Sequence, residues 1–179
     1  EDSRKDRQPE FTQLDMEMSF VDMKDIQDMI EGMMAFVWKG LYGTELQTPF
    51  PHIAYRDAME RFGSDKPDLR VKLELKEVTD IVKDSAFKVF SSVSQLHNGK
   101  VVVLRVPGAC SMPRSEIDGY TEFVKIYGAK GLAYIKVNDK AKGRDGLQSP
   151  IVKNLSDDIL AKLLEVTGAQ DSDILFFGA

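Results

Sequence analysis

The sequence has very little of what several kinds of catalytic site require. Among its 179 residues are one cysteine, Cys110, and two histidines, His52 and His97. It can therefore form no intramolecular disulfide, and it has no Cys/His cluster with the spacing of a zinc site. No serine lies in a nucleophile-elbow pattern, and no Gly-x-x-x-x-Gly-Lys segment could cradle phosphates. These absences argue against triad hydrolysis, and they leave Cys110 as either a reactive thiol or a small buried hydrophobe.

The chain also lacks long apolar runs and an excess of positive charge. No apolar run approaches the length of a membrane span or a signal-peptide core, so we expect no membrane and a reducing, cytoplasmic compartment. The 29 acidic residues outnumber the 24 basic ones, which gives a net charge of −5. Because nucleic-acid binding needs clustered Lys and Arg, any RNA contact must be local. A hydrophobic content of 42% is nevertheless enough to build a globular core.

What the chain does have is an unusual opening stretch. After a charged, turn-prone run, apolar and polar residues alternate strictly, and this alternation predicts a strand over residues 11–20. The apolar positions are Leu14, Met16, Met18 and Phe20, and the polar positions are Gln13, Asp15, Glu17 and Ser19. The polar side presents only carboxylates, an amide and a hydroxyl. It is either a solvated sheet face or the floor of a site for a polar, amine-bearing ligand.

Two helices are expected next. Asp22 is a plausible N-cap for a helix that ends near Gly40, and its methionine-rich stripe is either core filling or a peptide groove. A second helix over residues 54–62 should stop at Gly63. Between them, His52 has no second ligand near it in sequence, which favours a structural role over a metal site. The charged turn 63–70 is either a solvated linker or a loop that touches a charged ligand.

The remaining residues alternate between shorter elements. The pattern predicts a helix over 75–82, an extended segment over 87–93, strands over 100–106 and 132–137, a helix over 113–127 capped by Ser111, a helix over 156–168 and a strand over 173–179. Strand, helix and strand in this order form a compact α/β unit without a glycine-rich phosphate fingerprint. The basic segment 138–150, with Lys140, Lys142 and Arg144, is either an exposed loop or a weak contact for RNA or a protein partner.

Four segments carry a family resemblance. Residues 6–20, which end in Gln13-Leu14-Asp15-Met16-Glu17-Met18-Ser19-Phe20, closely resemble the second half of motif 2 of bacterial-type aspartyl-tRNA synthetases, which are class II enzymes. Residues 63–70, 123–134 and 174–179 are similar to further signatures of that family. The resemblance therefore spans essentially the whole chain.

This resemblance implies roles for individual residues. The candidate catalytic residues are Arg4 and Arg7, the candidates for contact with ATP are Glu1, Gln8 and Phe11, and the candidates for contact with aspartate are Gln13, Asp15 and Glu17. Arginines can neutralise phosphate charge, an aromatic ring can stack on adenine, and a carboxylate can hold an α-ammonium group. No residue is assigned as a metal ligand, although the family uses ATP with Mg²⁺.

The resemblance also implies an architecture. It predicts an α+β / α/β protein with part of a class II antiparallel catalytic sheet in residues 1–83, an inserted α/β domain in 84–171 and a return strand in 172–179. The implied partners are ATP, L-aspartate and tRNA, and the implied assembly is a homodimer. The arginine that precedes the Glu1 position, motif 1, motif 3 and the anticodon-binding domain do not occur in the sequence, so we expect a fragment that makes no aspartyl-adenylate by itself.

Two functions remain open at this stage, beside a third interpretation in which the chain is a structural α/β domain that binds no ligand. The first is aspartate–tRNA ligase, which activates aspartate with ATP and transfers it to tRNA. The second is a noncatalytic module, of the kind found in some aminoacyl-tRNA amidotransferases, that binds or positions tRNA or a protein partner. The motif 2 segment favours the first, because an insert-type module would not include it. Whether asparagine tRNA is also charged does not follow from the sequence.

Overall fold

The computed structural model describes residues 8–179, and the chain divides into two compact units. Unit 1 ends at His52, and unit 2 comprises Ile53–Ala179. Every buried hydrophobic residue of the described chain lies in unit 2, from Ala58 onward. Among the described residues, therefore, only unit 2 has a hydrophobic core.

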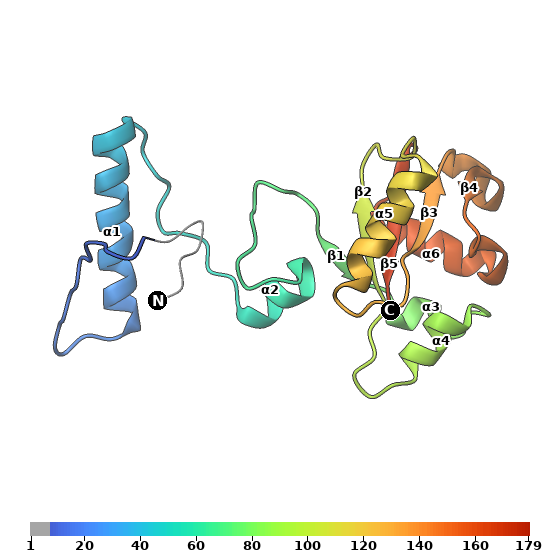
Figure 1. The fold of residues 1–179 in the computed structure, drawn as a ribbon, viewed down its shortest axis with the longest axis horizontal. Coiled ribbons are helices and arrows are strands. Elements are labelled where there is room, and N and C mark those ends of the chain that lie inside the picture. Colours follow the sequence, from blue (N-terminus) through green and yellow to red (C-terminus); the bar gives the residue numbers. More distant parts are fainter. Residues whose placement is uncertain (1–7) are drawn as a thin grey trace. The chain divides into compact units, whose positions relative to one another are not determined.

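The described part of unit 1 consists of an irregular segment, residues 8–22, helix α1, Met23–Tyr42, and a second irregular segment, residues 43–52 (Figure 1). Asp22 is the N-cap, as predicted, and forms a capping box with Asp25. The helix extends beyond the predicted end at Gly40 because Gly43, with φ at 67°, provides the left-handed C-cap. None of the residues of α1 is buried within the described structure.

The prediction of a strand over residues 11–20 is wrong for this structure. Residues 11–18 have no regular secondary structure, and Phe20 has a positive φ of 59°. Alternation supplies only the two faces of a strand, whereas its backbone N–H and C=O groups need a neighbouring strand to pair with. The five strands of the described residues pair with one another in unit 2, and none pairs with this segment.

Unit 2 is built on one five-stranded antiparallel sheet with the strand order β1-β2-β5-β3-β4. Its elements are α2 (Tyr55–Phe62), β1 (Leu75–Glu77), α3 (Thr79–Val82), α4 (Lys88–Ser94), β2 (Val102–Val106), α5 (Arg114–Lys125), β3 (Ala133–Val137), η1 (Lys140–Gly146), β4 (Leu147–Gln148), η2 (Val152–Asn154), α6 (Asp157–Thr167) and β5 (Asp173–Gly178). Because β5 is antiparallel to both β2 and β3, the latter two run parallel with β5 between them. The unit β2-α5-β3 is thus a split βαβ motif.

The core lies on both faces of the central strand β5. Leu175 and Phe177 join the larger apolar cluster, which the short helices α3 and α4 and helix α6 cover. Ile174 and Phe176 point to the other face and pack with Ile117 of α5. Figure 1 shows α5 crossing the sheet. Because successive side chains of β5 point to opposite faces of the sheet, both faces are covered by helices, and unit 2 has three layers.

Several predicted elements are confirmed and others are not. The strands at 102–106, 133–137 and 173–178 are present, and α6 is capped by Ser156, which accepts a hydrogen bond from the amide of Ile159. The helix predicted over 75–82 is instead β1 followed by the one-turn helix α3. Pairing with β2, in which Leu75 lies opposite Leu104, decides the conformation of residues 75–77.

Two further corrections concern helices. Residues 88–94 form the helix α4 rather than an extended segment, because Phe87, Phe90 and Val93 recur every three residues and pack on one cluster. Helix α5 begins after Pro113, and no side chain caps it, so the prediction of Ser111 as its cap is wrong.

The sheet contains residues from Leu75 to Gly178, so it extends across both expected domain boundaries, at residues 84 and 171. β1 precedes residue 84, and β5, expected as a return strand, is the central strand of this sheet. The boundaries of an inserted domain stay a prediction. In the structure, β1 and β5 pair with strands β2 and β3, which lie within residues 84–171.

Candidate functional site

The predicted site residues lie at the start of the chain. Glu1, Arg4 and Arg7 lie outside the described residues. Gln8, Phe11, Gln13, Asp15 and Glu17 are all exposed on the irregular segment of unit 1, and Phe11 is 67% exposed. The structure therefore places the last five on one continuous segment but does not enclose them.

The polar members of this segment are exposed. Within residues 8–179, the side chains of Gln13, Asp15 and Glu17 form no hydrogen bond or ion pair. Their spacing of two residues is the one that places side chains on a common face when a chain is extended. The carboxylates and the amide could therefore act together on a cationic or amide-bearing ligand once the segment is extended.

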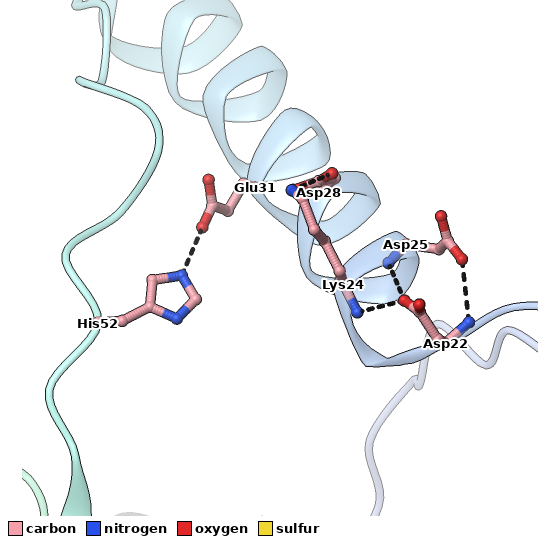
Figure 2. Close-up of polar contacts among 6 residues, drawn as sticks. All are labelled: Asp22, Lys24, Asp25, Asp28, Glu31 and His52. Atoms are coloured by element: carbon pink, nitrogen blue, oxygen red, sulfur yellow. Dashed lines mark hydrogen bonds and ion pairs between the residues drawn. The ribbon is translucent and has the colours of Figure 1, made fainter.

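The beginning of α1, which follows this segment, is fixed by acidic side chains (Figure 2). The carboxylate of Asp22 accepts hydrogen bonds from the amides of Lys24 and Asp25 at 2.8 and 3.2 Å, and Asp25 accepts one from the amide of Asp22 at 2.9 Å. Lys24 forms an ion pair with Asp28 at 2.7 Å, and this hydrogen bond raises the pKa of the lysine. These carboxylates serve the helix rather than a ligand.

His52 has a partner that the sequence did not reveal. Its Nε2 atom lies 3.8 Å from a carboxylate oxygen of Glu31, whose side chain is only 13% exposed (Figure 2). The contact ties the end of unit 1 back to the middle of α1. In residues 8–179 there is no group of three or more His, Cys, Asp or Glu side chains that could hold a metal ion. The contact with Glu31 fits the structural interpretation of His52.

Two of the family-like segments meet in unit 2. Residues 123–134 span the end of α5 and the start of β3, and residues 174–179 comprise most of β5 and the residue that follows it. Ala133 lies opposite Phe177 and Tyr134 opposite Phe176 in the antiparallel pair. A cleft of about 590 Å³ opens beside this pair, lined by the loop 128–132, α5, α4 and the end of β5. Both segments resemble the family in sequence, but only the fold shows that they are neighbours.

The third family-like segment, 63–70, is an internally braced loop. The carboxylate of Asp68 accepts hydrogen bonds from Nε and Nη2 of Arg70, at 2.9 and 2.6 Å, and from the amide of the same residue at 3.0 Å. The side-chain hydrogen bond and then the amide lower the pKa of Asp68 to about 2. The amide of Lys66 donates to Oγ of Ser64. The loop thus has a defined shape and leaves the side chain of Lys66 exposed.

The basic segment 138–150 is largely neutralised by its own fold. Lys142 pairs with Asp139 at 2.9 Å, and Arg144 pairs with Asp157 at 2.7 Å. Arg144 also donates to the carbonyl oxygens of Val152 and Leu155, which anchors η1 to the start of α6. Two of the three cations are thus committed to structural contacts, which weakens the case for RNA binding here.

Cys110 is half-buried and hydrogen-bonded. Its thiol donates to Oδ1 of Asn138 at 2.9 Å. The contact links the loop after β2 to the end of β3. This position fits a packing role better than that of a nucleophile, which would need an adjacent base.

The chain matches a known protein family. The family described as tRNA synthetases class II (D, K and N) matches residues 1–173, so the chain belongs to this family. Its members join amino acids to tRNA. The mixed α/β fold is consistent with this assignment. Among residues 8–179, no helix is long and apolar enough to cross a membrane.

Proposed function

We propose that this protein is an aspartate–tRNA ligase. What supports the choice among aspartate, lysine and asparagine is the resemblance of residues 6–20 to motif 2 of bacterial-type aspartyl-tRNA synthetases, which includes Gln13, Asp15 and Glu17 at every second position. Carboxylates of this kind suit the α-ammonium group of an amino acid, and an amide suits its polar side chain. The family assignment to class II synthetases supports the reaction type.

The proposed reaction has two steps. A carboxylate oxygen of L-aspartate attacks the α-phosphorus of ATP, the bond to the bridging oxygen breaks, and pyrophosphate leaves. A ribose hydroxyl at the end of tRNA then attacks the activated carbonyl and releases AMP. No protein nucleophile takes part, so catalysis rests on positioning and electrostatics.

Each candidate residue has a defined task in this scheme. Arg4 and Arg7 neutralise phosphate charge, Phe11 stacks on adenine, and Glu1 and Gln8 contact ATP. Gln13 and Asp15 contact aspartate, and Glu17 supports them. Mg²⁺ accompanies ATP in this chemistry, but residues 8–179 offer no cluster of ligands for it, and no step is assigned to the metal. The protein acts as a cytoplasmic homodimer in this proposal.

The test is ATP–pyrophosphate exchange by the full-length gene product with aspartate, asparagine or lysine as the amino acid. We expect exchange with aspartate alone. Asp15→Ala should lower kcat/KM for aspartate about 10- to 100-fold, because it removes a charge-assisted contact. Ser19→Ala, four residues further along the same segment, is the matched control and should leave exchange unchanged. Exchange that requires lysine or asparagine would refute the proposal.

A further inference from the structure

Two groups of charged side chains join α2 to the edge of the sheet in unit 2. Arg61, in the last turn of α2, donates through Nε and Nη2 to the two carboxylate oxygens of Glu74, at 3.1 and 3.0 Å. Lys100 lies 3.0 Å from a carboxylate oxygen of Glu60 in α2 and 3.0 Å from one of Glu77 in β1. We call this set the charged latch; its members are Glu60, Arg61, Glu74, Glu77 and Lys100.

The latch has a specific place in the chain. Arg61 and Glu74 lie on either side of residues 62–73, so their two parallel hydrogen bonds close that loop at its base. Gly63, with φ at 67°, turns the chain out of α2 into the loop. Lys100 precedes β2 and reaches both α2 and β1. The base of the loop 62–73 is therefore held by the bidentate pair of Arg61 and Glu74, and next to it Lys100 bridges α2 and β1.

Little else holds this region closed. On α2 only Ala58 is buried, at 3% exposure, while Phe62 and Leu75 are partly exposed. β1 is an edge strand that pairs with β2 over three residues, Leu75–Glu77. Since the apolar contact is small, the exposed ion pairs of Arg61 and Lys100 add to the backbone pairing of β1 with β2 in holding α2 at the sheet edge. The pKa shifts of these residues agree with the contacts. Glu74 raises the pKa of Arg61, and Arg61 lowers the pKa of Glu74. Glu77 and Glu60 raise the pKa of Lys100.

We propose that the charged latch is a conformational device that holds the loop 62–73 closed on the sheet edge and releases it when its charges are screened or removed. In the closed state, the exposed side chains of Lys66 and Lys72 are presented on a loop whose base is held by the pair of Arg61 and Glu74. In the released state, α2 and the loop detach from β1. The device depends only on the contacts within unit 2 and is independent of the proposed reaction.

Limited proteolysis of the 179-residue chain with trypsin tests the latch. Within the loop, trypsin can cut after Arg70 and Lys72, whereas Lys66 is followed by Pro67 and resists cleavage. Cleavage of a native loop requires local opening. Arg61→Glu should therefore accelerate formation of the products ending at Arg70 and Lys72 about threefold or more, in keeping with an exposed ion pair. The products are quantified by mass spectrometry.

The decisive variant is the charge swap. Arg61→Glu combined with Glu74→Arg restores an ion pair and should return the cleavage rate to that of the unmodified chain. Lys83→Gln is the matched control: it removes another exposed ion pair, with Asp80 at 3.2 Å, and should not change the rate. Far-UV circular dichroism establishes that each variant is folded. A single variant cleaved at the original rate, or a swap cleaved as fast as the single variant, would overturn the proposal.

Salt provides a second measurement that needs no variant. Raising NaCl from about 0.05 to about 0.5 M shortens the screening length severalfold and should accelerate cleavage of the unmodified chain at Arg70 and Lys72. The rate is normalised to cleavage of an unstructured peptide of the same loop sequence under each condition. A normalised rate that does not rise with salt would contradict the latch.

Discussion

The carboxylate of Asp173 joins three separate segments at the beginning of β5. It accepts hydrogen bonds from Nε of Arg105 at 2.6 Å, from the amide of Gly108 at 3.0 Å and from the amide of Gln170 at 2.8 Å. Asp173 is 2% exposed. Burial raises the pKa of this carboxyl, but the amides of Gln170 and Gly108 and the Arg105 side chain outweigh burial, so the pKa lies below its usual value.

This arrangement gives a prediction about acid stability. Because the folded-state pKa is lowered, the stabilisation is fully present above the unfolded-state pKa of about 3.9 and is lost as the pH falls through the folded-state value. Asp173→Asn should lower the free energy of unfolding at pH 7 by about 3 kcal/mol and flatten its pH dependence below about pH 4. Urea unfolding between pH 2 and pH 7 measures both effects. Asp84→Asn, at an exposed carboxylate, should change neither.

At the scale of elements, β5 determines the stability of unit 2, since both of its faces are covered. Phe177 is 2% exposed and lies against Phe90, with ring centroids 5.3 Å apart. Phe177→Ala should lower the free energy of unfolding by about 3–5 kcal/mol, because it removes buried surface and leaves a cavity. Phe123→Ala, at a site 55% exposed on α5, should cost less than about 1 kcal/mol. Chemical denaturation monitored by circular dichroism measures the free energy of unfolding of both variants. Equal losses of free energy would contradict the place of Phe177 in the core.

The elements that the sequence predicted well are those with local signals. Asp22, Gly63 and Ser156 mark helix ends through contacts with residues at most a few positions away. The β-branched run before Pro107 likewise marks β2. By contrast, β1 carries Lys76 and Glu77 and becomes a strand only because β2 lies beside it. Long-range contacts such as Arg105 with Asp173 have no signature in the linear order of residues.

The candidate site was predicted unevenly for the same reason. The alternation over 13–20 predicts which side chains would share a face in a strand, but residues 11–18 form no strand here, because strand formation depends on partners that no local pattern contains. The roles of Gln8, Phe11, Gln13 and Asp15 came from resemblance and stay predictions. The contact of Glu31 with His52 and the charged latch emerged only from the fold, because they join residues far apart in sequence.

At the scale of the whole molecule, the two units should differ in stability. All buried hydrophobic residues described lie in unit 2, and α1 contributes none. We therefore expect residues 53–179 alone to keep the sheet and a cooperative thermal transition whose midpoint lies within a few degrees of that of the complete chain. Hydrogen exchange measured by mass spectrometry checks this: the amides of β5 should be protected equally in both proteins. Loss of that protection in residues 53–179 would show that unit 2 needs unit 1.

The place of β5 in the sheet also governs the order of synthesis and folding. β2 and β3 both pair with β5, yet β5 is the last of the five strands to leave the ribosome. Until then, β2 has only the short β1 beside it and β3 only the two-residue β4, so each presents an open edge. The edge of β2 therefore stays open while α5, β3 and α6 are made, and the edge of β3 while α6 is made, until β5 enters between them.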